Sequence, residues 1–247
     1  AAFTPASTLS SGAQISFVVG QSNLNNNGPS DASDALDHPR AVVVLSDRLV
    51  AVDTANHRGQ VTPPIPATNG EAASFAIGQN SANNDNAANA GDPVGADTLE
   101  TPAGAAQSGG YLFVADTGSH RILRIPLTAL GANRPAADIV LGQADFAGSA
   151  TNRGGTAAPE TLSSPTHVAA DGTRLWVADT GNHRVVAYDL ATLASGVAAA
   201  LVVTDGGGGT TLLSPRGVAA SPERLVIADS GNHRVLIWEP PPLTATD

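Results

Sequence analysis

Cysteine, methionine and lysine are all absent from this chain of 247 residues, and aromatic residues make up only 4% of it. The lack of cysteine excludes both a disulfide framework and a thiolate metal site. With few aromatic rings, a core has to be built from Val, Leu, Ile and Ala, which the 42% of hydrophobic residues can supply. No apolar run approaches the ~20 residues that span a bilayer, so we expect no membrane insertion.

Positive charge is also scarce, and the formal net charge is −10 at pH 7. Binding to nucleic acid needs a basic face, so we do not expect nucleic acid as a partner. The chain begins Ala-Ala-Phe-Thr. A start on small residues is typical of the position after signal-peptide cleavage, and we therefore expect a processed protein that is exported, either periplasmic or secreted.

One polar motif recurs between apolar stretches, as in WVADTGNHRVVAY at residues 176–188. An acid, a hydroxyl, an imidazole and a guanidinium lie close together there, which is typical of an active site. A catalytic centre needs only one copy, whereas a motif written four times belongs to a repeated structural unit. We therefore interpret it as a structural turn. Its acid, histidine and arginine positions are Asp53, His57 and Arg58; Asp116, His120 and Arg121; Asp179, His183 and Arg184; and Asp229, His233 and Arg234.

Each copy of the motif stands in a longer frame. A proline lies 14 residues before each motif aspartate, and the small and β-branched residues after it predict an inner strand. A second strand leads into the turn and a third follows it. Fourth strands are predicted at FAIGQ, IVLGQ and LVVTD, which start at residues 75, 139 and 201. The repeats cover about residues 38–79, 101–143, 164–205 and 214–239.

Units of four strands repeated around an axis are typical of a β-propeller, an all-β fold. The frame, with Gly-Val-Ala in the inner strand and Ala-Asp-Thr-Gly-Asn-His-Arg-Val at the turn, resembles the NHL-repeat family. The Asn-His-Leu that names this family stands in the place of Asn182, His183 and Arg184. The resemblance covers most of the chain and implies a propeller. We predict a single propeller domain over residues 1–247 with four NHL-like repeats.

The last repeat has no fourth strand after it, because the chain runs into EPPPLTATD, whose prolines cannot join a ladder. A matching stretch, SFVVGQ at residues 16–21, lies ahead of the first repeat. We predict that this N-terminal strand pairs with residues 235–238, completes the last blade and closes the ring. A four-bladed monomer is favoured, and a homodimer that exchanges the strand to make eight blades is the alternative.

Long loops rich in Asn, Asp and Gly follow the fourth strands, on the same face of the ring as the motif turns. Loops on a rigid scaffold carry function. We therefore predict a non-catalytic binding or scaffold propeller that presents this acidic face to a protein or carbohydrate ligand. The binding candidates are Asp31, Asp34, Asp85, Asp92, Asp97 and Asp145. No cofactor is expected, with calcium as the alternative because it takes Asp and Asn oxygens.

The alternative function is a metal-dependent propeller enzyme, a lyase or hydrolase with a site in the channel. The family resemblance implies that some relatives, such as the peptide-amidating lyases, hold a metal there with one His from each contributing blade. Here the inner strands carry only His167, with His38 just ahead of Pro39, and two histidines make a poor zinc site. No nucleophile triad or phosphate loop is recognisable. We therefore predict no catalytic residue and no metal ligand.

Overall fold

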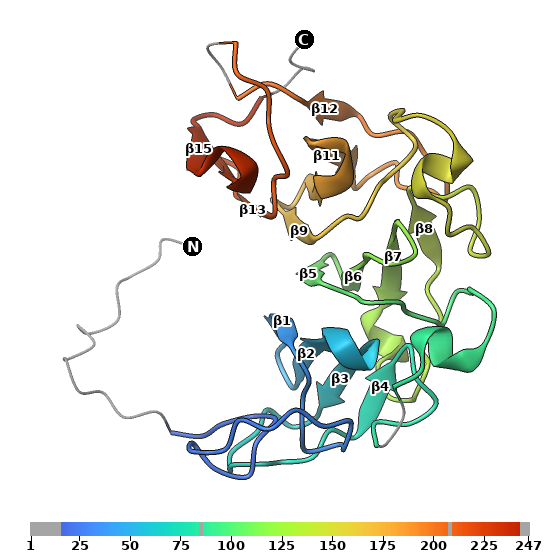
Figure 1. Ribbon diagram of the computed structural model, residues 1–247, viewed down its shortest axis with the longest axis vertical. Coiled ribbons are helices and arrows are strands. Elements are labelled where there is room, and N and C mark those ends of the chain that lie inside the picture. Colours follow the sequence, from blue (N-terminus) through green and yellow to red (C-terminus); the bar gives the residue numbers. More distant parts are fainter. Residues whose placement is uncertain (1–15, 84–85, 207–208, 243–247) are drawn as a thin grey trace.

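Four antiparallel sheets follow one another along the chain in the computed structural model, which describes residues 16–83, 86–206 and 209–242. The sheets stand around a common axis as the blades of a β-propeller, with one sheet for each sequence repeat (Figure 1). The predicted all-β propeller fold is therefore confirmed.

Within each blade the strands are paired in chain order, and the first strand lies nearest the axis (Figure 1). The first blade consists of β1 (Pro39–Val44), β2 (Leu49–Asp53), β3 (Arg58–Thr62) and β4 (Phe75–Ile77). The second consists of β5 (Gly104–Ser108), β6 (Tyr111–Asp116), β7 (Arg121–Pro126) and β8 (Ile139–Leu141). The third consists of β9 (His167–Ala170), β10 (Arg174–Asp179), β11 (Arg184–Asp189) and β12 (Leu201–Val203). The last has three strands, β13 (Gly217–Ala220), β14 (Leu225–Asp229) and β15 (Arg234–Trp238).

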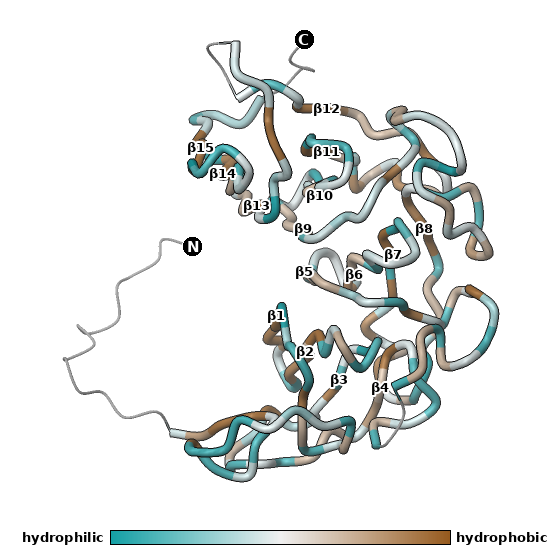
Figure 2. The backbone as a smooth tube through the Cα atoms, in the orientation of Figure 1, coloured by the Kyte–Doolittle hydropathy of each residue, from teal (hydrophilic) through white to brown (hydrophobic). Residues whose placement is uncertain are grey.

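The middle strands of the inner blades are covered on both faces by neighbouring blades. In β10, Leu175, Trp176 and Val177 are all fully buried, although consecutive residues point to opposite faces of the sheet. A continuous apolar run is what a strand buried on both faces requires. Figure 2 shows the same tendency in the coloured part of the chain, where apolar residues are frequent in the strands and hydrophilic residues are frequent in the loops.

The inner strands crowd one another at the axis, where β1 contacts β5, β5 contacts β9 and β9 contacts β13. Gly104 in β5 marks the closest approach. A Cβ atom at this position would lie 2.7 Å from the Cα of His167 and 2.8 Å from the carbonyl oxygen of Thr166. The small residues after each proline, from which inner strands were predicted, are therefore required by contact between the blades.

The predicted closure of the ring by the N-terminal strand is wrong for this structure. Residues 16–21 contain no strand, and β15 pairs only with β14 among the described residues. The carbonyl of Val18 instead accepts the N–H of Gly70 at 3.2 Å, beside the first blade. The blades form an open arc with β1 and β13 at opposite ends (Figure 1). Counting strands cannot give the angle between blades, because side-chain packing between them sets it.

Short 3-10 helices occupy the turns and loops. Three follow the second strands in the motif turns: η1 (Thr54–Asn56), η5 (Thr180–Asn182) and η6 (Ser230–Asn232). Two lie in the long loops after fourth strands, η2 (Ala88–Gly91) and η4 (Thr151–Gly154), and η3 (Leu127–Ala129) follows β7. None of the helices in the described ranges has the length and apolar character needed to cross a bilayer.

Candidate functional site

The motif aspartate and arginine form an ion pair within one turn. Arg121 Nε donates to Asp116 Oδ2 at 2.7 Å, and both side chains are fully buried. The other carboxylate oxygen accepts the backbone N–H of Glu100 at 2.6 Å, which ties the turn to the segment entering the same blade. The same ion pair recurs as Arg58–Asp53, Arg184–Asp179 and Arg234–Asp229.

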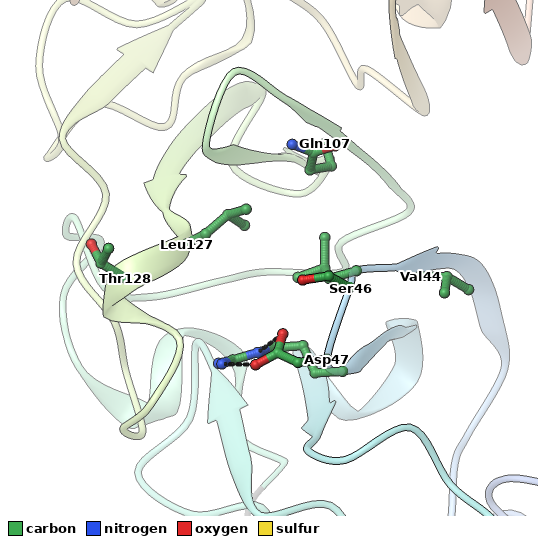
Figure 3. A pocket seen from close by; sticks show the side chains of 8 residues that line it. Val44, Ser46, Asp47, Gln107, Leu127 and Thr128 are labelled. Carbon is green, nitrogen blue, oxygen red and sulfur yellow. Dashed lines mark hydrogen bonds and ion pairs between the residues drawn. The ribbon is translucent and has the colours of Figure 1, made fainter. Parts of the chain in front are cut away.

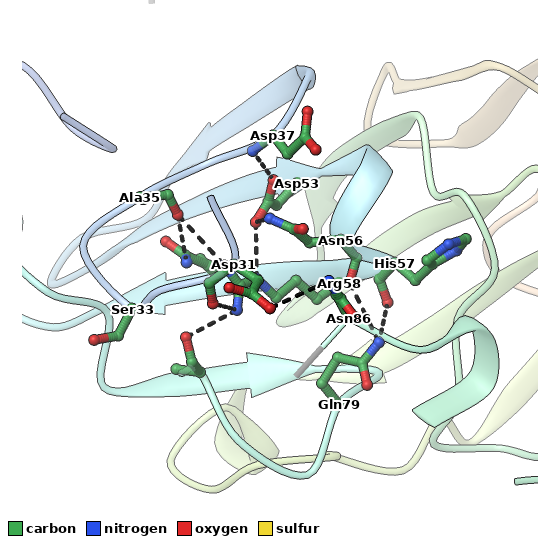
Figure 4. Close-up of polar contacts among 12 residues, drawn as sticks. Asp31, Ser33, Ala35, Asp37, Asp53, Asn56, His57, Arg58, Gln79 and Asn86 are labelled. Atoms are coloured by element: carbon green, nitrogen blue, oxygen red, sulfur yellow. Dashed lines mark hydrogen bonds and ion pairs between the residues drawn. The ribbon is translucent and has the colours of Figure 1, made fainter. Parts of the chain in front are cut away.

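The remaining donors of the arginine hold the loops that surround the turn. In the first blade, Arg58 donates to the carbonyl of Asp31 at 2.9 Å (Figure 4). It also donates to the carbonyls of Ala32 at 3.1 Å and Ala82 at 2.9 Å. A guanidinium has five N–H donors, so it can donate hydrogen bonds to several carbonyl groups at once. The polar groups of the motif are therefore used inside the fold.

Burial shapes the titration of the motif acids. It raises the pKa of Asp53, Asp116 and Asp179, and the arginine and the backbone donors offset part of this effect. For Asp229 burial also acts upwards, but its hydrogen-bond donors together lower the pKa below the ordinary value. The side chain of its partner, Arg234, is 28% exposed, so the last turn is the more open to water.

The motif histidine links each blade to the next. His57 Nδ1 accepts the backbone N–H of Thr101 at 3.0 Å, and His120 Nδ1 accepts that of Ser164 at 2.9 Å. The same bond joins His183 to Ser214 at 3.0 Å. The repeated motif predicts that these histidines belong to the turn, but it does not predict this bond between blades. The available signal was that each donor directly precedes the proline of the following repeat.

These bonds require an uncharged imidazole, because Nδ1 must present a lone pair. Burial lowers the pKa of His57 and His120, and the negative charge of Glu100 raises it by a smaller amount. Each motif histidine also has a φ of 53–55°, in the left-handed region. The histidine thus ends a short helix in the first, third and last turns, and in the first three turns it bonds to the next blade.

The Gly-Gln pair at the end of a fourth strand fastens the following loop. Gln79 Nε2 donates to the carbonyls of His57 at 3.3 Å and Ala87 at 2.7 Å. Gln143 Nε2 makes the equivalent bonds to His120 at 3.1 Å and Ala150 at 2.9 Å. Each glutamine therefore connects a motif turn to the long loop that passes over it.

The long loops of the first two blades share one backbone conformation. Asn89 and Asn152 both have positive φ and are each followed by a second residue of positive φ. Their N–H groups donate to equivalent carbonyls, Leu99 at 2.9 Å and Leu162 at 3.0 Å. These loops are built to one plan, which was not evident from their differing sequences.

The acidic candidates on the loop face have separate roles. Arg134 brings two of them together, with ion pairs to Asp92 at 2.6 Å and Asp97 at 2.9 Å. Asp145 Oδ1 accepts the N–H groups of two residues of its own loop. Asp31 accepts a hydrogen bond from the side-chain amide of Asn86. Asp34 is exposed, and Asp85 lies outside the described residues.

Neither a calcium site nor a zinc site is assembled in the parts of the chain that the structure describes. No three His, Asp or Glu side chains there form a group able to hold a metal ion. His167 has a buried Nδ1 without a hydrogen-bond partner, and burial lowers its pKa, with the Val218 backbone acting in the opposite direction.

A cavity of about 200 Å³ lies at the axis and is lined by Arg40, Ala103, Thr166, His167 and Arg216. Four of these residues directly follow the prolines that open the repeats, so equivalent positions from all blades converge here. Among the described residues, the Arg40 and Arg216 side chains form no hydrogen bond or ion pair. The other arginines all have partners. The sequence pattern pointed to His167 in an inner strand but gave no indication of the two arginines.

A second cavity, of about 460 Å³, lies between the first two blades (Figure 3). Its lining comes from the β1–β2 hairpin, including Ser46 and Asp47, and from Gln107 and Leu127 of the second blade. This hairpin is on the face opposite the motif turns, since successive strands run in opposite directions. Arg48 donates to the Leu130 carbonyl at 2.8 Å and so joins the two blades beneath the cavity.

No family model and no curated protein matches this sequence. Among solved structures, the chain is similar to the β-propeller domain of Myceliophthora thermophila Cps50 (Swd1), with a TM-score of 0.50, 13% identity, and coverage of 81% of this chain and 53% of that one. It is also similar to Kuenenia stuttgartiensis hydrazine synthase, with a TM-score of 0.49, 12% identity, and coverage of 87% and 52%. The chain is a β-propeller. It spans about half the length of these two neighbours, and the likeness concerns the fold alone.

Proposed function

We propose that this chain is a non-catalytic binding propeller of the NHL-repeat type, whose loop face receives a protein or carbohydrate ligand. The observation that carries the proposal is that the long loops of the first two blades share one backbone conformation, which side-chain hydrogen bonds hold in place. Gln79 and Gln143 hold equivalent carbonyls, while the residues displayed outwards differ from loop to loop. A rigid frame with variable polar side chains lowers the entropy cost of binding.

Charge gives the loop face its chemical character. Asp34 and Asp145 are exposed, and the carboxylate of Asp145 is oriented by the N–H groups of its own loop. Oriented acceptors suit ligands that present hydroxyl, amide or cationic groups. A propeller fold by itself favours neither catalysis nor binding, so the function has to be argued from the residues of this face.

The test begins with a glycan array and a phage-displayed peptide library, both probed with the intact chain. Hits are then measured with the double variant Asp34→Asn and Asp145→Asn, which removes charge and keeps side-chain shape. The matched control is Asp47→Asn with Glu223→Gln, two exposed acids in hairpins on the opposite face. We expect the loop-face variant alone to weaken binding about tenfold. Loss with the control variant alone, or no hit from either library, contradicts the proposal.

A second candidate is binding of an anionic group at the axis, and the two unpartnered arginines favour it. Arg40 and Arg216 come from the two ends of the arc but line one cavity. Two cations without counterions are unusual in a chain with a net charge of −10. The lowered pKa of His167 keeps that side chain neutral near pH 7, so the positive charge comes from the arginines. A carboxylate or phosphate group matches such donors.

Calorimetric titration with inorganic phosphate and with citrate tests this candidate. Replacing Arg40 and Arg216 with Gln should weaken binding at least tenfold. The control replaces Arg48 and Arg224, which already pair with Asp47 and Glu239, and it changes the net charge equally. Equal affinities for the two double variants would show that any binding reflects overall charge.

A further inference from the structure

The stretch Phe17–Val19 lies where the outer strand of a preceding blade would lie. The carbonyl of Val18 accepts the N–H of Gly70 at 3.2 Å. In the same way, the carbonyl of Ala76 in β4 accepts the N–H of Arg134, in the next blade, at 2.8 Å. Val18 therefore holds the place beside the first blade that an outer strand holds beside the blade after it.

Two further contacts repeat this correspondence. The N–H of Val18 donates to Asn69 Oδ1 at 2.9 Å, as that of Ala76 donates to Asn133 Oδ1 at 2.8 Å. The next glycine, Gly20, has a φ of 83° and sits against a leucine, as Gly78 and Gly142 do with a φ of 85°. The local structure of a fourth strand is thus present, but the described residues supply no blade for it to complete.

The opposite end of the arc has a blade that lacks this strand. On the edge strand β15, Val235 is 63% and Ile237 62% exposed, while Phe17 is 47% exposed. In the third blade, Val185 pairs with Val203 and Ala187 with Leu201. The same register would place Val19 opposite Val235 and Phe17 opposite Ile237. The exposed apolar side chains at the two ends would then cover one another.

The hydrogen bonds that join successive blades also have an unpaired donor at one end of the arc and an unpaired acceptor at the other, among the described residues. Thr101 N–H bonds to His57 Nδ1, but among the described residues neither the N–H of His38 nor the Nδ1 of His233 has a partner. His38 has a φ of 51°, and Thr101, in the equivalent position, has a φ of 45°. A donor of the right conformation is therefore present at one end and its acceptor at the other.

Gln21 repeats the pattern. It donates to the carbonyl of Gly28 at 2.9 Å, as Gln79 does to Ala87. Within the ranges that the structure describes, it has no counterpart of the bond that Gln79 makes to a histidine carbonyl. Beside it is a cavity of about 380 Å³, lined by Val19, Leu36 and His38 among others. In the other junctions a motif turn with its histidine lies at this place.

These matches cannot be made within one copy, because the two ends lie at opposite ends of the arc and the contacts between successive blades fix their spacing (Figure 1). We propose that a second copy of this chain supplies them. Residues 17–19 of each copy complete the last blade of the other, and two such head-to-tail junctions close a ring of eight blades. Because Val19 of each copy would meet Val235 of the other, the dimer has two-fold symmetry and its interface is isologous. Eight blades lie within the range of about four to eight that propellers use.

The absence of cysteine permits a clean cross-linking test. One preparation carries Val19→Cys and another Val235→Cys, and the two are mixed under oxidising conditions. Facing residues on paired strands have Cβ atoms about 4.5–5.5 Å apart, within reach of a disulfide. The matched control pairs Val19→Cys with Ile237→Cys, which is equally exposed but two residues out of register. Circular dichroism confirms that each variant is folded.

We expect a disulfide-linked dimer from the first mixture and at least tenfold less from the control. Light scattering of the parent chain should give about 49 kDa, twice the 24.6 kDa of one copy. If the measured mass is that of one copy at all concentrations and no cross-link forms, the proposal is overturned, and the missing blades would have to come from a different protein chain. Equal yields from the two mixtures overturn the register. A ladder of higher multiples overturns the closed ring, because it indicates an open assembly.

Discussion

Arg121 and Arg234 make the same ion pair in different surroundings. Both donate through Nε to the aspartate five residues earlier at 2.7 Å. The side chain of Arg121 is fully buried between blades, whereas 28% of Arg234 is exposed at the end of the arc. Both aspartates are inaccessible, but burial raises the pKa of Asp116, whereas burial of Asp229 is outweighed by its donors, which lower its pKa below the ordinary value. The partly exposed Arg234 is also screened by water, so one motif should give two different losses of stability.

Arg121→Gln should lower the free energy of unfolding by about 3–5 kcal/mol, because it leaves Asp116 as a buried carboxylate without its partner. Arg234→Gln should cost less, about 1–2 kcal/mol, because Asp229 keeps the Leu213 N–H and the Asn232 amide as donors and the lost arginine was partly exposed. Urea denaturation of the two variants measures the difference. Equal losses would mean that burial between blades does not govern the contribution of the motif.

The histidine bonds predict a dependence on pH. His57 and His120 have lowered pKa values in the folded chain, so the unfolded chain takes up a proton first as the pH falls. Their contribution to stability is therefore complete above the ordinary value of 6.5 and is lost as the pH falls below it towards the folded values. The free energy of unfolding should be lower at pH 5.5 than at pH 7.5.

His120→Asn should remove part of that dependence and cost about 1 kcal/mol at pH 7.5, through loss of the bond to Ser164. Asn tolerates the positive φ of this position, so the turn is kept. His233→Asn is the control under conditions where the chain is a monomer, because His233 has no described partner in a following blade. Identical pH profiles for the parent and His120→Asn would contradict the assignment.

At the scale of the strand, contact between blades explains composition better than β propensity does. Inner strands are made of small residues because their backbones touch, as Gly104 does against Thr166 and His167. The third strand of the first blade follows its sequence pattern. Its prolines predict a short strand, and β3 (Arg58–Thr62) stops just before the first of them, one residue shorter than β7 and β11.

Gly104→Ala should lower the free energy of unfolding by about 1–3 kcal/mol, because the added methyl group meets backbone that cannot rotate away. The control is Gly131→Ala, where nothing lies within 4 Å of the added atom and φ is not positive. Thermal denaturation of both variants distinguishes them. Equal melting temperatures would show that the inner strands can move apart at no cost.

Most of the fold followed from spacing, since a proline and a motif aspartate at constant separation determine where three strands and a turn fall. The outer strands also followed, because the register to the glycine of Gly-Gln is kept. The bonds from His57 to Thr101, the cavity between Arg40 and Arg216, and the open arc did not follow. Each depends on how one blade is placed against another, and a single sequence contains no direct measure of that placement.

At the scale of the molecule, stability should vary from blade to blade. The second and third blades are covered on both sides, whereas the last has three strands and one uncovered face. Opening of such a unit requires the loss of fewer contacts. The position of a blade in the arc should therefore determine how readily it opens.

Hydrogen exchange at concentrations below dimer formation should be faster in β13–β15 than in β9–β12. The difference should be largest at Val235 and Ile237, on the uncovered edge. Raising the protein concentration should protect β15 if a second copy covers it, while β6 and β10 serve as internal references. Uniform protection across the four blades would contradict this order of stability.

The histidine bond has a consequence for how such chains change in length. Its acceptor is in the motif turn of one repeat and its donor at the start of the next, so each inner repeat carries one half of two different junctions. A copied repeat inserted between two others would bond to the histidine of the repeat before it and to the backbone N–H of the repeat after it, and no new residue would be needed. Unequal recombination within the gene could thus add or remove a whole blade in one step, and a designer could do the same by duplicating residues 164–213.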